Sequence, residues 1–355
     1  MAGIERFRAV RYAGAAGSPT ELVAPPYDAV TAEERERLRE RSPYNVVRLT
    51  LPDSPETAGR LYREWLSQGV LERELEAATW LLVEEFVGPD GVDRERRGVV
   101  ASLAVEPYEA GRVLPHERTV PRIREERLQL LRATGVQPEP IFLLLEGQLG
   151  VAQPERDPDV HVDGSRLWRL ADFDPASLQD ARLLIADGHH RYESTLELGD
   201  RARIMALLVP TDDPGLEVFP THRTFAGRPD LAEDGEGEPL SGLDEGLELL
   251  AAEPRTRSAA LAYRNDGVEL LRGNEGELDV ELVGRFGLDG IGYTPRAEDA
   301  TAAVDRGDAD VAFLVRGPRV EDVFDVARRG ERMPPKSTYF FPKPLSGLLF
   351  HEVAR

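Results

Sequence analysis

The densest group of side chains that could do chemistry is the pentapeptide DGHHR at residues 187–191. It follows the apolar run 183–186 and precedes a helix-compatible pattern at 192–198, which predicts a strand-to-helix junction. A glycine at such a junction permits a sharp turn and a close approach of the backbone to a ligand. The free N–H groups of the following helix and the guanidinium of Arg191 suit phosphate oxygens. Residues 187–191, named the DGHHR box here, are therefore the first candidate site.

Other candidate residues lie far from the box in sequence. Glu117 follows a proline-bounded turn and could act as a general base if the fold brings it near Asp187; otherwise it belongs to a solvated surface pair with His116. Lys336-Ser337-Thr338 is a weak phosphate signal because no P-loop glycines precede it, and the alternative is a loop that ties down the C-terminal part. These two segments are candidates only in combination with the box.

Two further segments carry polar side chains whose role the sequence leaves open. The tandem prolines Pro25-Pro26 hold the backbone extended and present Tyr27 and Asp28 at a fixed angle. His222 follows a strand and a loop that could close the same site. A structural role remains the alternative at both segments.

Composition excludes several classes of protein. The 355 residues carry a net charge of −21, which argues against nonspecific binding to nucleic acid because a phosphate backbone requires a basic surface. The absence of cysteine excludes disulfides, thiol catalysis and cysteine metal sites. No run of apolar residues approaches the length of a membrane span, and the N-terminus lacks a signal-peptide core. We therefore expect a cytoplasmic protein with a small-molecule substrate and neither a nucleic-acid nor a membrane partner.

Strand and helix patterns alternate along the chain, which predicts the mixed α/β (α+β) class. Thr31 and Glu34 form a capping box for a helix at 32–41, and the apolar stretch 45–49 is predicted to be a strand. Further along, 123–133 has a helical pattern and 140–145 that of a buried strand. These patterns divide the chain into three predicted segments: 1–95, 96–224 and 225–355.

Several motifs together resemble the DUF1015 family along nearly the whole chain. The matching stretches lie at 24–28, 116–119, 140–142, 186–192 and 333–340. The central segment is also similar to the ParB/sulfiredoxin superfamily, and most of all to its free-serine kinases. This resemblance implies a ParB/sulfiredoxin-like catalytic core at 96–224, with N- and C-terminal α/β extensions. Sulfiredoxin's catalytic cysteine has no counterpart in the box, so reduction of sulfinic acids is excluded.

The resemblance implies a kinase that phosphorylates the hydroxyl of free L-serine, with pyrophosphate or a nucleotide (ADP or ATP) as the donor and Mg²⁺ as the metal. The implied catalytic residues are Glu117, Asp187 and His116, with Asp187 also the candidate metal ligand. The implied phosphate- and donor-binding residues are Gly188, His189, His190, Arg191, Lys336, Ser337, Thr338 and Lys343. The implied substrate-binding residues are Tyr27, Asp28 and Thr119. A ParB-like nucleotide-dependent switch and a non-catalytic phospho-metabolite-binding protein remain as alternatives.

Overall fold

The computed structural model describes residues 3–199, 201–227, 237–287 and 291–353, and the chain forms two compact units. Unit 1 comprises 1–86, 93–216 and 342–355, whereas unit 2 comprises 87–92 and 217–341. Unit 2 is therefore inserted in the sequence of unit 1, and the last segment of the chain returns to unit 1 at Pro342. The division into 1–95, 96–224 and 225–355 stays a prediction.

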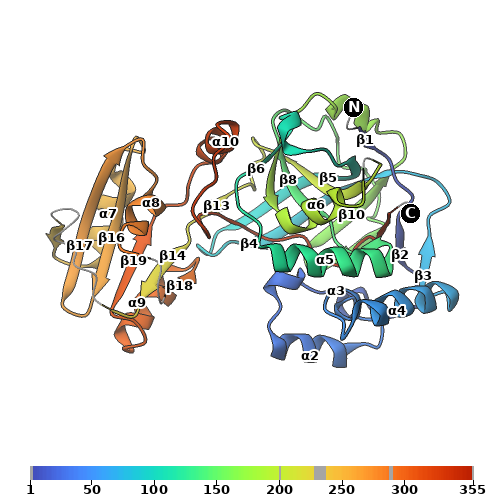
Figure 1. The fold of residues 1–355 in the computed structure, drawn as a ribbon, viewed down its shortest axis with the longest axis horizontal. Coiled ribbons are helices and arrows are strands. Elements are labelled where there is room, and N and C mark those ends of the chain that lie inside the picture. Colours follow the sequence, from blue (N-terminus) through green and yellow to red (C-terminus); the bar gives the residue numbers. More distant parts are fainter. Residues whose placement is uncertain (1–2, 200, 228–236, 288–290, 354–355) are drawn as a thin grey trace. The chain divides into compact units, whose positions relative to one another are not determined.

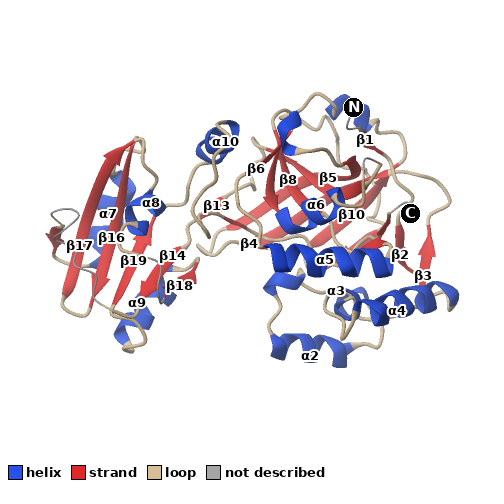
Figure 2. Ribbon diagram, in the orientation of Figure 1, coloured by secondary structure: helices blue, strands red, loops and turns tan. Residues whose placement is uncertain are grey.

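Helices and strands occur together in both units, which confirms the mixed α/β class (Figure 2). Nine strands of the described part of unit 1 form one mixed sheet. Its strand order is β6 (Val113–Pro115), β11 (Leu183–Asp187), β8 (Ile141–Leu145), β12 (Arg203–Pro210), β5 (Asp93–Ala104), β4 (Thr79–Val87), β10 (Ser165–Leu170) and β9 (Val160–Val162), with β1 (Ile4–Glu5) on β5. The β6–β11 and β8–β12 pairs are parallel, whereas β11 and β8 are antiparallel. Assignment of this sheet to a ParB/sulfiredoxin-like core stays a prediction.

The core of unit 1 forms because apolar side chains alternate along the central strands. Leu183 and Ile185 of β11 and Leu143 of β8 lie in one buried cluster, to which Tyr192 of the following helix also belongs. The helices α5 (Pro121–Thr134) and α6 (His189–Leu196) lie next to each other in unit 1 (Figure 1). The DGHHR box joins β11 to α6, and because α6 packs against α5 the box lies near α5.

The N-terminal part of unit 1 contains a series of helices, of which α4 (Pro55–Ser67) packs against α5. The others are α1 (Pro19–Leu22), α2 (Ala32–Arg41) and α3 (Val47–Thr50). The predicted helix 32–41 is confirmed, and its first turn is capped as expected, since Glu34 N donates to Thr31 Oγ1 over 3.2 Å. The predicted strand at 45–49 is wrong because its second half is α3. Short ladders join β2 (Val10–Tyr12) to β3 (Leu71–Arg73) and β7 (Val136–Gln137) to β21 (His351–Glu352).

Unit 2 has a sheet of its own, in the order β15 (Glu238–Leu240), β17 (Gly267–Glu275), β16 (Arg257–Arg264), β19 (Val311–Val315), β14 (His222–Phe225) and β18 (Ile291–Thr294). Its helices are α7 (Leu243–Ala252), α8 (Asp279–Gly284), α9 (Ala297–Asp305) and α10 (Val320–Arg328). Two apolar clusters form because alternate residues of β16 and β19 point to opposite faces. A separate pair joins β13 (Val218–Phe219) to β20 (Tyr339–Phe340). No described helix in either unit combines the length and the apolar character that a membrane crossing requires.

Candidate functional site

The DGHHR box lies at the strand-to-helix junction that the sequence predicted. Strand β11 ends at Asp187, and α6 begins at His189 after Gly188 with a φ of +100°. A Cβ atom at Gly188 would lie 2.5 Å from Cγ2 of Ile141. Both the left-handed backbone and the close neighbour therefore require glycine. This turn directs the first N–H groups of α6 to the end of the sheet, which is the geometry in which a helix binds an anion.

Asp187 is held by two cations that come from different parts of the chain. Its Oδ1 lies 2.7 Å from Nζ of Lys343, and its Oδ2 accepts a hydrogen bond of 2.6 Å from Nη2 of Arg191. Lys343 also pairs with Asp28 in the 3-10 helix Tyr27–Ala29. The structure thus brings together candidate residues from the N-terminal, central and C-terminal motifs within unit 1.

Glu139 is a buried carboxylate of this network that the sequence reasoning missed. It is 6% exposed, and its Oε1 lies 3.3 Å from Nη1 of Arg191. Its other oxygen accepts a hydrogen bond from the hydroxyl of Ser346. Arg191 is consequently fixed from both sides, by Asp187 and by Glu139. A glutamate directly before the proline of a buried strand was the only sequence signal for this position.

The carboxylates around Lys343 and Arg191 keep both of these side chains charged. Burial lowers the pKa of Lys343, but the neighbouring carboxylates of Asp187 and Asp28 outweigh this effect and raise the pKa well above its ordinary value. Burial likewise opposes the charge of Arg191, whose pKa is nevertheless raised by Glu139 and Asp187. Two permanent positive charges therefore lie at the start of α6, where a phosphate group would need them.

The turn that carries Glu117 lies beside the box because β6 runs parallel to β11. Pro115 pairs with Ile185 across the two strands, so Glu117 and Asp187 each follow the paired position by two residues. Neighbouring strands lie about 4.8 Å apart, and parallel strands end at the same edge of a sheet. Glu117 and Asp187 therefore leave the sheet at the same edge. Glu117 is partly buried there.

Backbone hydrogen bonds from this turn fix both histidines of the box. Nε2 of His189 accepts from the N–H of His116 over 3.3 Å, and Nε2 of His190 accepts from the N–H of Val120 over 2.9 Å. An imidazole that accepts at Nε2 is neutral and carries its proton on Nδ1. Burial lowers the pKa of His190, which favours the same neutral form. The histidines thus tie the Glu117 turn to the start of α6.

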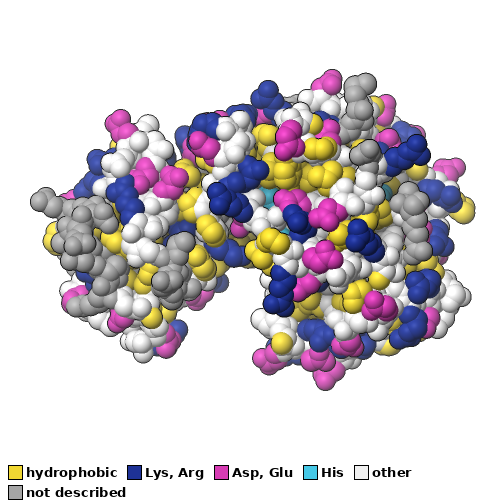
Figure 3. Space-filling view, viewed as in Figure 1, with side chains coloured by type: hydrophobic (Ala, Val, Ile, Leu, Met, Phe, Trp, Pro, Cys, Tyr) yellow, Lys and Arg dark blue, Asp and Glu magenta, His cyan; other side chains and the backbone are white. Residues whose placement is uncertain are grey.

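His116 itself anchors the turn to strand β11. Its Nδ1 lies 2.7 Å from the carbonyl oxygen of Ile185, and its ring meets that of His189 edge-on with 4.8 Å between the centroids. His116 is only 2% exposed. In the space-filling view, histidine atoms reach the surface of unit 1 near β6 and α6, among hydrophobic, acidic and basic side chains (Figure 3). The assignment of His116 as a catalytic residue stays a prediction.

The predicted substrate-binding residues lie around the same network. Tyr27 stacks on Arg127 of α5, with 4.2 Å from the guanidinium carbon to the ring centroid, and burial raises the pKa of Tyr27 to about 12. Thr119 donates a hydrogen bond of 2.6 Å from its hydroxyl to Glu193 of α6. That Tyr27, Thr119 and Asp28 contact a substrate stays a prediction.

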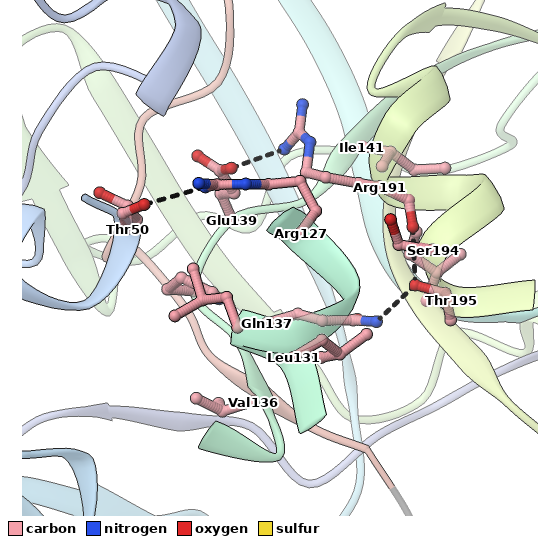
Figure 4. Close-up of a pocket in the computed structure, with 13 residues that line it drawn as sticks. Thr50, Arg127, Leu131, Val136, Gln137, Glu139, Ile141, Arg191, Ser194 and Thr195 are labelled. Atoms are coloured by element: carbon pink, nitrogen blue, oxygen red, sulfur yellow. Dashed lines mark hydrogen bonds and ion pairs between the residues drawn. The ribbon is translucent and has the colours of Figure 1, made fainter. Parts of the chain in front are cut away.

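A small cavity lies between α3, α5, α6 and β8, next to Arg191. Its volume is about 60 Å³, and its walls include the apolar side chains of Leu130, Leu131, Val136, Ile141 and Ile204. Arg127 and Arg191 enter it from neighbouring helices, with Glu139 and Thr50 opposite them (Figure 4). The hydrogen bond from Arg127 to the carbonyl oxygen of Thr50 closes one side. This cavity adjoins the ion-pair network from the side of α5.

The remaining predicted donor residues, Lys336, Ser337 and Thr338, belong to unit 2, whereas Asp187 belongs to unit 1. A cleft common to both therefore stays a prediction. Asp187 as a magnesium ligand also stays a prediction: both of its carboxylate oxygens are paired with cations, and no group of three or more metal-ligating side chains occurs in the described ranges. Magnesium held by Asp187 would require one of these ion pairs to open.

Two L-serine kinases are similar to this chain in sequence. An ADP-dependent L-serine kinase, SerK, of Thermococcus kodakarensis is 30% identical over 163 residues, which are 44% of this chain and 65% of that kinase. An ATP-dependent L-serine kinase of Staphylothermus marinus is 22% identical over 254 residues, 68% of this chain and 87% of that kinase. This chain therefore spans less than two thirds of the length of SerK.

Among solved structures, a free serine kinase in complex with AMP matches with a TM-score of 0.43 and 19% identity, over 71% of this chain and 91% of that chain. A family model described as a protein of unknown function, DUF1015, matches residues 4–285. This match covers all the strands of the large sheet and the whole DGHHR box. The chain is therefore a member of the DUF1015 family, distantly related to ADP- and ATP-dependent L-serine kinases.

Proposed function

We propose that this protein is a small-molecule kinase that phosphorylates the hydroxyl of free L-serine to O-phospho-L-serine. The observation that carries the proposal is the placement of Glu117 and Asp187 at the same edge of two parallel strands, directly before a helix N-terminus. One carboxylate there can accept a proton while the helix end and two cations stabilise a phosphoryl group. The distant relationship to serine kinases supports serine as the acceptor.

The proposed step is a direct phosphoryl transfer. The serine hydroxyl oxygen forms a new bond to phosphorus, its proton passes to Glu117, and the bond between phosphorus and the leaving group of the donor breaks. Phosphoryl transfer depends on positioning and charge neutralisation more than on covalent chemistry. The transferred group would be held by the N–H groups at the start of α6, by Arg191 and by the Nδ1 atoms of His189 and His190.

Asp187 and Lys343 would position the reactants. Asp187 is fixed by both cations, so its carboxylate can orient the acceptor hydroxyl without itself moving. Lys343 is held between Asp187 and Asp28 and would neutralise charge on the donor. Magnesium, when it is bound with the donor, would supply further charge neutralisation at the phosphate oxygens. The donor is ADP, ATP or pyrophosphate, of which the two nucleotides are the donors named for the relatives.

A direct assay tests the proposal. Purified protein is incubated with L-serine, Mg²⁺ and one of ADP, ATP or pyrophosphate, and O-phospho-L-serine is measured by chromatography or ³¹P NMR. We expect phosphoserine with at least one donor, and no product when serine is omitted. Binding of a donor without phosphoserine formation would contradict the proposal and leave the alternative of a non-catalytic phosphate-binding protein or nucleotide-dependent switch.

A further inference from the structure

The sheet of unit 2 contains a buried arginine that no carboxylate of the described residues neutralises. Arg223 is the second residue of β14 and is 1% exposed. No acidic side chain pairs with it anywhere in the described ranges, and its Nε and Nη1 atoms have no hydrogen-bond partner there. Other buried arginines differ: Arg96 pairs with Glu84 over 2.5 Å, and Arg316 pairs with Asp279 over 2.7 Å.

The position of Arg223 makes a charge without a carboxylate partner energetically unfavourable. It lies opposite Phe313 of β19 and Tyr293 of β18, on the face of the sheet that carries an apolar cluster. Burial lowers the pKa of Arg223 because the charged form loses its hydration. An arginine side chain nevertheless stays protonated in proteins, so the charge cannot be removed by releasing the proton. Tyr293 and the carbonyl oxygen of Pro335 offset this loss only in part, because neither carries the negative charge of a carboxylate. A buried charge without a counterion is unfavourable, and a bound anion would offset this cost.

The polypeptide next to Arg223 is the segment 335–338, which contains the Lys-Ser-Thr motif. Nη2 of Arg223 donates to the carbonyl oxygen of Pro335 over 3.4 Å. Lys336 adds an exposed ammonium group at this segment, and its backbone is left-handed with a φ of +57°. Such a conformation in a residue other than glycine costs about 1 kcal/mol or more and persists where the surroundings fix it. The Ser337 hydroxyl donates to the carbonyl oxygen of Pro334 over 2.6 Å, which holds the turn.

We propose that Arg223 and Lys336 form an oxyanion-binding site within unit 2, and that its ligand is a phosphate or diphosphate group. A guanidinium can present two parallel N–H groups to such an anion, and a nearby ammonium adds charge without a fixed direction. Both residues belong to unit 2, and binding there does not require serine or turnover. The same chemistry is offered by inorganic phosphate, pyrophosphate and the terminal phosphates of a nucleotide.

Hydrogen exchange measured by mass spectrometry provides a local test in the full chain. Pyrophosphate, inorganic phosphate or ADP is added at millimolar concentration without serine, and exchange is followed in peptides that contain 222–225 and 334–338. We expect at least one of these anions to slow exchange in both peptides. Protection by ADP alone would identify a nucleotide diphosphate as the ligand, whereas protection by pyrophosphate or phosphate would identify the free anion. No protection by any of them would overturn the proposal.

Matched variants make the test specific to Arg223. Arg223→Met keeps a long side chain without charge and is expected to weaken the anion about tenfold or more. Arg306→Met is the control, since Arg306 is 62% exposed in the same unit and pairs with nearby Asp308. Lys336→Ala, at an exposed position, serves as a second variant if Arg223→Met does not fold, and a loss of at least threefold is expected. Protection that is unchanged in Arg223→Met, or in Lys336→Ala where that variant is needed, would overturn the proposal, whether or not the protein phosphorylates serine.

Discussion

Nζ of Lys343 lies 2.7 Å from Oδ1 of Asp187, although the two residues come from the C-terminal segment and from the centre of the sequence. Lys343 also pairs with Asp28 from the N-terminal part. Lys343 directly follows Pro342, the residue at which the chain re-enters unit 1. The C-terminal segment is thus part of the candidate site, and its lysine joins two carboxylates that would otherwise repel each other.

Lys343→Met is expected to lower both stability and phosphoserine formation. The two carboxylates lose their shared cation, and because Lys343 is 21% exposed we expect a loss of about 1–3 kcal/mol in the free energy of unfolding. Urea unfolding provides the measurement. Arg122→Met is the control in the same unit, since Arg122 is 87% exposed, and its effect should stay within about 0.5 kcal/mol. Equal stability of the two variants would show that the Lys343 pairs contribute nothing.

Gly188→Ala tests the turn of the box. The substitution places a Cβ atom on a backbone with a φ of +100° and within 2.5 Å of Ile141, so we expect a loss of about 2–4 kcal/mol. Gly199→Ala is a matched control because its φ is +108° but no atom lies within 4 Å of the new Cβ; it should cost about 1 kcal/mol. Thermal and urea unfolding compare the two. Equal losses would contradict the close packing of Gly188 on β8.

Acid is expected to destabilise the protein through His351. This residue is 6% exposed in β21, and burial lowers its pKa to about 4. The unfolded chain binds the proton near pH 6.5, so between pH 6.5 and 4 the unfolded state carries more protons and the free energy of unfolding falls as the pH falls. The full contribution is about 3 kcal/mol.

Urea unfolding of wild type and His351→Gln at pH 7 and pH 5 measures this contribution. The variant should lose less stability than wild type over this interval. His161→Gln changes an exposed histidine and should retain the wild-type pH dependence. Equal pH dependence of the His351→Gln and His161→Gln variants would show that His351 does not contribute to the acid destabilisation.

The sequence predicted those helices and turns that are determined by residues close together in the chain. The helix 32–41 was predicted from the capping box of Thr31 and Glu34, and the junction at 187–189 from an apolar run that ends before a glycine. The stretch 45–49 was predicted wrongly because the deciding contacts are distant. The side chain of Asn45 donates to the carbonyl oxygens of Glu21 and Val23 and accepts from the N–H of Val47, which starts a short helix.

The site was predictable as a set of motifs but not as a network. Asp28 was singled out by the tandem prolines before Tyr27, Asp187 by the glycine of the box, and Lys343 by the family resemblance. The sequence did not single out Glu139, whose importance arises only when Arg191 and Ser346 are brought to it by the fold. Likewise, the lack of a carboxylate beside Arg223 among the described residues is a property of tertiary packing, and no pattern in the sequence reports it.

The most direct test of the account is the rate of phosphoserine formation by Glu117→Gln. The substitution preserves the shape of the side chain and removes the proton acceptor, so kcat should fall about 100-fold or more while the affinity for the donor stays nearly unchanged. Glu126→Gln, which alters a glutamate on the exposed side of α5, is the control and should retain wild-type kcat. A wild-type kcat for Glu117→Gln with serine would contradict the account, because the proton would then have to pass to another group.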